Sequence, residues 1–299
     1  MIAVAVTLLF WSSAFAGIRA GLRGGYTPGH LVLLRFLSAS VVFFVYAAIR
    51  KVKPLERRDI LRVAALGWTG ISVYHIALTF GEVTVPAGTA SLLIAAAPAF
   101  TALIAMVALR ERLTRVGWLG IALGFGGIAL ITFASGQSHG FTRGALLILL
   151  SAVCTSVFFV YQKPLFQRYS AIDLTAYFTW FGTLPMLWFV PGLWGQLQTA
   201  TAAATLSGVY IGVFPAAVAY VAWAIALSGG RATGVASALY INPLLAICFG
   251  WIWLGEVPAV VSLAGGAIAL AGVVVVNVWG AGRKSARPKT DTQATAADA

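Results

Sequence analysis

Residues 98–111 read PAFTALIAMVALRE, and residues 243–256 read PLLAICFGWIWLGE. In each stretch a proline opens an apolar run and a glutamate closes it, and the two stretches lie 145 residues apart. Because many matches share this one offset, the sequence predicts two copies of one unit. Further residues recur at the same offset: Gly67 and Gly212, Ala87 and Ala232, Leu109 and Leu254, Gly120 and Gly265, Ala122 and Ala267, and Gly127 and Gly272.

The composition around these stretches excludes a water-soluble fold. Of the 299 residues, 60% are hydrophobic and 9% are charged, and the mean hydropathy is +0.92, whereas soluble domains have about 25% charged residues. Apolar runs of about 20 residues, the length that crosses a bilayer as a helix, fill most of the chain. We therefore predict an all-α integral membrane protein with ten helices, near residues 2–21, 29–49, 60–80, 86–109, 116–134, 144–163, 173–194, 206–227, 232–254 and 259–279.

The repeat divides these helices into a first five-helix copy at residues 1–136 and a second at 141–280. We expect residues 281–299 to form a basic, polar and disordered tail in the cytoplasm. Because five is odd, equivalent helices cross the membrane in opposite directions, which predicts inverted repeats around a central cavity, as in secondary transporters.

The basic residues indicate how the chain sits in the membrane. With the N-terminus in the cytoplasm, most cations fall on the cytoplasmic side, which the positive-inside rule favours. Arg19, Arg23 and Arg143 fall on the other side. The net charge of +12 therefore reads as a topology signal, and we expect no nucleic-acid partner. The cytoplasmic cations are Arg50, Lys51, Lys53, Arg57, Arg58, Arg62, Arg110, Arg112, Arg115, Lys163, Arg168, Arg231, Arg283, Lys284, Arg287 and Lys289.

Residues 98–111, followed by Gly120 and Gly127, resemble the repeat signature of the drug/metabolite transporter superfamily, and residues 243–256 resemble it more closely. With the opening Phe10-Trp11-Ser12-Ser13, the chain looks most like the EamA-type branch, which includes bacterial aromatic amino acid exporters. The resemblance implies ten helices, of which the first, third, fourth, sixth, eighth and ninth line a central cavity. It also implies alternating access and export of small metabolites, amino acids including aromatic ones, across the bacterial inner membrane. Arg110 stands where many relatives carry glycine.

All eight carboxylates fall in loops, in the tail or at helix ends. Proton-coupled transporters use intramembrane carboxylates as relays, so this placement favours facilitated export or coupling through another titrating group. His75 is the candidate, on a helix face shared with Trp68, Ser72, Thr79 and Glu82. Its side chain would titrate, contact a substrate carboxylate, or hydrogen-bond a neighbouring helix.

Other intramembrane residues have a functional and a structural interpretation. Arg35 would pair with Glu82, extend to the membrane surface, or bind a substrate carboxylate. Pro98 and Pro243 are expected to kink their helices beside a cavity, with Asn242 and Tyr240 next to the second kink as substrate contacts or links between helices. The alternative for the aromatic candidates is ordinary packing. The predicted substrate-binding residues are Trp11, His75, Phe158, Tyr161, Tyr220, Trp223, Tyr240 and Asn242.

The sequence gives no sign of an enzyme, because it contains no nucleophile–base pair, metal-ligand cluster or cofactor motif. We expect no cofactor and no metal site, and partners limited to a small-molecule substrate and the lipid bilayer, with a monomer compatible with the sequence. The main rivals are a passive channel and an exporter of another class of metabolite or drug.

Overall fold

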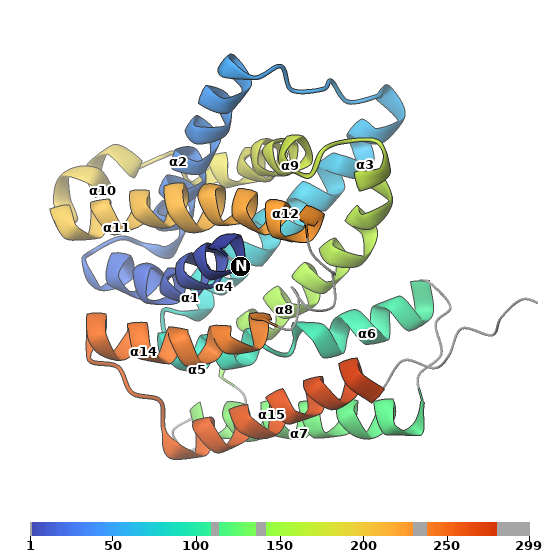
Figure 1. Cartoon of the computed structure of the whole chain (residues 1–299). Helices are drawn as coiled ribbons and strands as arrows, with labels where there is room; N and C mark the ends of the chain where they lie inside the picture. Colours follow the sequence, from blue (N-terminus) through green and yellow to red (C-terminus); the bar gives the residue numbers. More distant parts are fainter. Residues whose placement is uncertain (1, 109–113, 136–141, 230–237, 280–299) are drawn as a thin grey trace, which may run out of the picture.

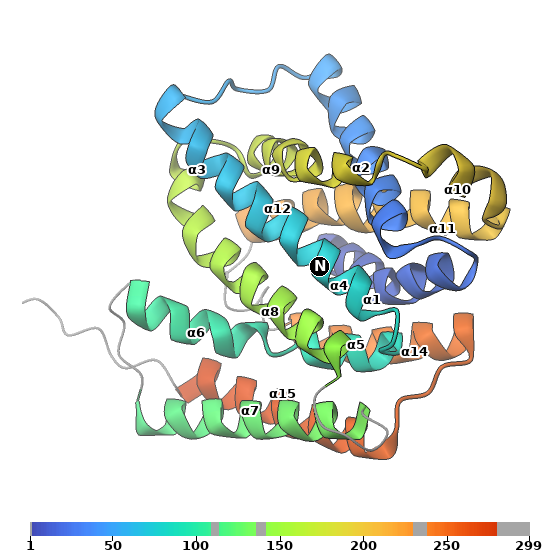
Figure 2. The same ribbon diagram turned by 180° about the vertical axis from the view of Figure 1, so that it is seen from behind.

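The computed structural model describes residues 2–108, 114–135, 142–229 and 238–279, and each regular element in these ranges is helical (Figures 1 and 2). η1 and η4 are π-helical turns, and η2, η3 and η5 are 3-10 turns. The elements are α1 (Ile2–Arg23), α2 (Pro28–Ile49), α3 (Arg57–Gly67), η1 (Trp68–Val73), α4 (Tyr74–Gly81), α5 (Ala87–Ile94), α6 (Ala97–Ala108), α7 (Arg115–Ser135), α8 (Arg143–Gln162), η2 (Lys163–Gln167), α9 (Ala171–Met186), η3 (Leu187–Phe189), α10 (Leu193–Thr199), α11 (Ala202–Val213), η4 (Phe214–Val218), α12 (Ala219–Gly229), η5 (Ala238–Ile241), α14 (Asn242–Leu254) and α15 (Val260–Trp279).

Several of these segments have the length and composition of membrane spans. The outer surface carries many exposed apolar side chains, among them Leu61, Trp188 and Val260, on a scale that water-soluble monomers rarely show. The prediction of an all-helical protein whose helices suit a membrane is confirmed for the described part of the chain. Within the described residues, five segments are long and apolar enough to span, namely Ile2–Arg23, Pro28–Ile49, Arg57–Gly81, Arg143–Gln167 and Ala202–Trp223. Shorter apolar helices cover Ala87–Thr101, Arg115–Ile131, Leu239–Leu254 and Val260–Val276.

Two predicted helices have different limits in the structure. The run predicted at 86–109 is interrupted at Ala95 and Ala96, just before Pro98, which lies in the first turn of α6. The helix predicted to reach residue 194 ends at Met186, because Pro191 cannot donate a backbone hydrogen bond and Gly192 adopts a left-handed conformation, with φ of 86°. Of the run predicted at 232–254, residues 232–237 lie outside the described residues.

Backbone irregularities recur at the offset seen in the sequence. Residues 68–73 of η1 correspond, 145 positions later, to 213–218, which contain η4. The interruption at 95–96 corresponds to 240–241 in η5, and Pro243 lies in the first turn of α14, as Pro98 does in α6. Both departures from α-helix therefore occur at equivalent places.

Hydrogen bonds between the two predicted copies recur in the same way, with 144 or 145 residues between equivalent positions. Each bond joins a residue in 1–136 to one in 141–280. The three equivalent pairs of bonds are Thr7 to Ala219 O (3.3 Å) and Ser151 to Tyr74 O (2.9 Å); Ser12 to Asn242 Oδ1 (3.0 Å) and Ser156 to Ala97 O (2.8 Å); and Ser207 to Gly17 O (2.8 Å) and Arg62 to Tyr161 O (3.0 Å).

Helices α7 and α15 lie side by side at one edge of the molecule (Figures 1 and 2). Their contact is made of glycines: a Cβ added at Gly127 would lie 2.4 Å from both Gly265 O and Ala269 N, and one at Gly272 would lie 2.4 Å from Gly124 N. Small residues allow this close backbone approach and are the usual means of association between helices in lipid.

Candidate functional site

The aromatic candidates on α1 and α12 meet at one place. The ring centroid of Trp11 lies 5.3 Å from that of Tyr220 and 5.4 Å from that of Trp223, within the range of favourable aromatic pairs. The Trp11 indole also donates a hydrogen bond to Pro215 O at 3.2 Å. Because Pro215 belongs to the π-helical turn η4, Trp11 is tied to the irregular backbone that precedes α12.

Asn242 joins this group through α1. Ser12, the residue after Trp11, donates a hydrogen bond to Asn242 Oδ1 at 3.0 Å. Asn242 is the first residue of α14 and follows the 3-10 turn η5, which contains Tyr240. The structure therefore brings together four of the predicted residues, Trp11, Tyr220, Trp223 and Asn242, which we call the aromatic cluster.

The other candidates lie elsewhere. Phe158 is buried against Gly70 and against Phe178 of α9, with ring centroids 4.9 Å apart. Tyr161 is 44% exposed near the end of α8. His75 is buried between the rings of Phe36 and Tyr74.

His75 belongs to a second group, which we call the polar cluster: Arg35 on α2, His75 and Thr79 on α4, and Glu82 directly after α4. These residues are 3%, 2%, 1% and 0% exposed, respectively. Among the described residues, there is no hydrogen-bond partner for Arg35 Nε and Nη1, for either ring nitrogen of His75, for Thr79 Oγ1 or for either carboxylate oxygen of Glu82. The sequence pattern predicted the shared face of His75, Thr79 and Glu82, which lies inside the protein.

The structure does not show two of the roles expected for Arg35, an ion pair with Glu82 and a side chain that extends to the membrane surface. Its side chain does not extend to the surface, and it forms no ion pair with Glu82 among the described residues. Arg35 O lies against Gly212 of α11, where an added Cβ would approach to 2.3 Å. This contact places the Arg35 backbone directly against α11, and the residue as a whole is 3% exposed.

Glu82 lies next to a third group of charges. Glu256, after α14, accepts hydrogen bonds from Arg19 Nε (2.9 Å) and Nη2 (2.8 Å), from Arg23, and from the backbone N–H of Ala87 (2.9 Å). Arg19 also donates to Glu82 O at 2.6 Å. These contacts, which we call the Glu256 clasp, join α1, the α4–α5 turn and the α14–α15 turn at the end of the molecule where α1 and α14 both end (Figure 1).

Burial raises the pKa of the Glu82 carboxyl well above its usual range, while the positive charges of Arg19 and Arg35 act in the opposite direction.

The sequence did not predict the Glu256 clasp, because the segment around Glu256 contains no cation and both arginines come from α1, more than 230 residues earlier. Its counterpart Glu111 lies outside the described residues.

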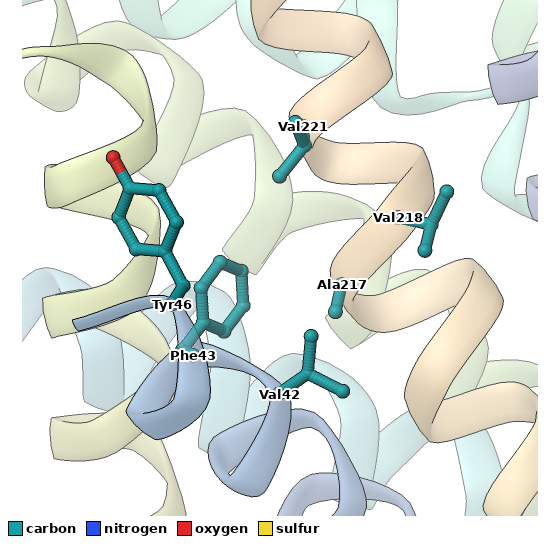
Figure 3. Close-up of a pocket in the computed structure, with 6 residues that line it drawn as sticks. All are labelled: Val42, Phe43, Tyr46, Ala217, Val218 and Val221. Carbon is teal, nitrogen blue, oxygen red and sulfur yellow. The ribbon is translucent and has the colours of Figure 1, made fainter. Parts of the chain in front are cut away.

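A cavity of about 190 Å³ lies between α2 and the η4–α12 segment. Figure 3 shows Val42 and Phe43 of α2 facing Ala217 and Val221 across it. Because its lining is almost wholly apolar and its volume is below the roughly 300 Å³ of ordinary ligand pockets, this cavity suits an acyl chain better than a polar metabolite.

Comparisons with known proteins agree with this architecture. The chain is 39% identical over 273 residues to the uncharacterized transporter YdfC of Bacillus subtilis, covering 91% of this chain and 89% of that protein. It is also 39% identical over 282 residues, 94% of both chains, to a probable terminal-alkyne amino-acid exporter of Streptantibioticus cattleyicolor. A solved crystal structure with 20% identity shares the fold, with a TM-score of 0.61 over 92% of this chain and 95% of the other. The model of the EamA-like transporter family matches residues 1–133 and 142–278, and the chain therefore belongs to this family of membrane transporters.

Proposed function

We propose that this protein is a secondary transporter that exports small metabolites, most of all amino acids including aromatic ones, across the bacterial inner membrane by alternating access. The observation that carries the proposal is the aromatic cluster, in which Trp11 of the first copy meets Tyr220 and Trp223 of the second. Ser12, next to Trp11, donates a hydrogen bond to Asn242 of the second copy. An aromatic wall with nearby hydrogen-bonding groups suits ligands that have a ring and a polar end. The similarity to a protein named as an amino-acid exporter supports the same substrate class.

The proposed architecture is ten helices in two inverted five-helix copies, at residues 1–136 and 141–280. The paired hydrogen bonds and the recurring helix interruptions support two equivalent units, as do the two ranges matched by the family model. The odd number of helices per copy is what makes the copies inverted. The proposed tail at 281–299 lies outside the described residues.

In the proposed orientation both termini are cytoplasmic, because this places most of the cations inside. The Glu256 clasp then lies on the periplasmic side and closes that end of the pathway. A transporter must close each end in turn, whereas an open channel needs no closure between its copies. The clasp therefore favours alternating access over a passive channel.

The proposed substrate site comprises the aromatic cluster together with His75 and Tyr240. Phe158 packs within the core and Tyr161 lies near the surface, so we assign neither to the site in this conformation. Pro98 and Pro243 each follow an interruption at which irregular backbone would face the pathway.

Counterflow in proteoliposomes tests the proposal. Vesicles loaded with unlabelled phenylalanine, tryptophan, alanine or threonine are diluted into trace labelled substrate, and the expected result is transient accumulation that saturates with substrate. A channel would give equilibration without accumulation. Accumulation for no member of the amino-acid panel would contradict the proposed substrate class.

Trp11→Ala and Trp223→Ala refine the test. Stacking on an aromatic wall contributes about 0.5–1.5 kcal/mol beyond buried area, so phenylalanine and tryptophan should lose more transport than alanine and threonine. Exposed Trp188→Ala is the matched control, and the amount of reconstituted protein is held equal. An equal loss for all four substrates would remove the aromatic cluster from the site.

A further inference from the structure

The polar cluster has an unmet demand for hydrogen bonds. Arg35, Thr79 and Glu82 contribute five buried nitrogen and oxygen atoms that have no partner in the described part of the chain, and His75 contributes both ring nitrogens. Such atoms are uncommon in folded proteins, because each loses its hydrogen bonds to water on burial. Ionisable groups inside a membrane bundle usually mark a substrate or ion pathway.

The charges in this cluster are opposite but not joined. Arg35 and Glu82 interact electrostatically without forming an ion pair, and they belong to different elements, α2 and the end of α4. Arg35 offers a site for a ligand carboxylate, and Glu82 offers a separate site for an ammonium group. Burial favours the neutral form of the Glu82 carboxyl in the empty protein, and pairing with a ligand ammonium group would favour its ionised form. A ligand that carries both charges on adjacent atoms would complete both.

Tyr220 connects the polar and aromatic clusters. It is among the electrostatic neighbours of Arg35, and its ring lies 5.3 Å from that of Trp11. A ligand with a charged end at Arg35 would therefore have an aromatic surface beside it.

We propose that the polar cluster recognises the zwitterionic end of an α-amino acid, with Arg35 binding the carboxylate and Glu82 the ammonium group, while the substrate side chain lies against Trp11 and Tyr220. This inference rests on the proposed function and assigns the chemical groups that give it specificity. Neither Arg35 nor Glu82 is needed for the aromatic wall itself.

The donor and acceptor groups match this ligand. A guanidinium offers parallel N–H groups that bind a carboxylate in a two-point contact, and Nε and Nη1 of Arg35 have no hydrogen-bond partner among the described residues. A carboxylate accepts hydrogen bonds from an ammonium group in the same charge-assisted way. Thr79 Oγ1 and the His75 ring remain as neutral hydrogen-bonding groups around the two charges.

Ordered water is the simplest alternative occupant, since water satisfies most buried polar groups that lack a protein partner. Water would make the cluster a structural feature with no preference for one ligand charge over another. If the cluster binds the ligand, removing a charge from the ligand and removing the opposite charge from the protein should have linked effects on affinity, whereas a water-filled cluster should show no such link.

The test measures ligand-induced thermal stabilisation of the purified full-length protein in detergent, with L-phenylalanine, phenethylamine and 3-phenylpropionate. The two analogues lack the carboxylate and the ammonium group, respectively. We expect the wild-type protein to bind phenylalanine about tenfold or more tightly than either analogue, because each analogue leaves one buried charge unpaired.

Substitutions should remove these preferences selectively. Arg35→Gln should reduce the affinity for phenylalanine to that for phenethylamine and leave the phenethylamine affinity unchanged. Glu82→Gln should reduce the affinity for phenylalanine to that for 3-phenylpropionate and leave the 3-phenylpropionate affinity unchanged. Arg35→Lys, which keeps the charge without the two-point contact, should give an intermediate affinity and provides a second variant if Arg35→Gln does not fold. Exposed Arg143→Gln is the matched control.

Three results would overturn the assignment. An Arg35→Gln protein that loses phenylalanine and phenethylamine equally would give Arg35 a structural role, and unchanged phenylalanine affinity in both variants would leave the cluster to water. If the wild-type protein exchanges phenylalanine in counterflow while these preferences are absent, the proposed function stands and the site assignment fails. If the wild-type protein neither binds nor exchanges any amino acid, both fail.

Discussion

Replacing Glu256 by Gln should open the end of the molecule that the clasp closes. Gln keeps the volume and one acceptor oxygen but removes the charge that attracts Arg19 and Arg23. The Glu256 and Arg19 side chains are 8% and 14% exposed, whereas Arg23 is 47% exposed, so the effect comes mainly from Arg19. Hydrogen bonds to charged groups contribute about 1.5–3 kcal/mol each and neutral ones about 0.5–1.5.

Arg19 makes two such bonds to Glu256, so their weakening should disfavour the closed state by about 2–3 kcal/mol. At about 1.4 kcal/mol per factor of ten, the open population should rise about 30- to 150-fold. The reporter is Ala16→Cys, buried on α1 one turn below Arg19, in a protein whose Cys154 and Cys248 are replaced by Ala. The rate of reaction with an impermeant maleimide added from the Glu256 side should rise by this factor.

Glu56→Gln is the matched control, because Glu56 pairs with Arg58 at an exposed site away from the clasp. Arg23→Gln should change the labelling rate by only a few-fold, as exposed ion pairs contribute about 0–1 kcal/mol. An unchanged rate in Glu256→Gln, or an equal increase in Glu56→Gln, would refute the reasoning.

Three further predictions follow from the same structure. Cysteines at Glu111 and Glu256 should react with impermeant reagents from opposite sides of the membrane, the first from the cytoplasm, and labelling from one side would contradict the inverted copies. Gly127→Leu should abolish a monodisperse elution profile, because an added Cβ would lie 2.4 Å from the α15 backbone, whereas Gly126→Leu, with open space around it, should be tolerated. Because burial raises the pKa of Glu82, the folded state retains the Glu82 proton to higher pH than the unfolded state. The melting temperature in detergent should therefore fall as pH rises above about 4.3. Glu82→Gln should flatten this pH dependence, and an unaltered slope in the variant would contradict the reasoning.

Much of the architecture was predictable from the sequence, because membrane helices can be recognised by their length and hydropathy. Pro98 and Pro243 predicted kinks in their helices, since a proline restricts its neighbours through local sterics alone, and the structure has an interruption just before each of them. The early end of α9 was less visible, because an apolar run continues through Leu187–Phe189 and the stop depends on Pro191 and Gly192 together. Periodicity placed the polar stripe of α4 on one face, but whether Arg35 pairs with Glu82 depends on how two separate elements, α2 and the end of α4, pack together. Such contacts between distant segments leave no local signal.

The proposed site is asymmetric although the frame around it repeats. His75 corresponds to Tyr220 at the repeat offset, but Thr79 and Glu82 correspond to Ala224 and Leu227, so only the first copy supplies the polar stripe. The second copy supplies Tyr220 and Trp223 to the aromatic cluster. Two equivalent copies can exchange their conformations to open either end of a pathway, and this requires symmetry of the backbone alone. A ligand with one charged end and one apolar end, by contrast, requires different side chains at the two related positions. In this protein the two copies share their helix interruptions and paired hydrogen bonds but differ in these side chains. A transporter of such a ligand needs this combination, because the backbone of the two copies must remain equivalent while the binding surface must not.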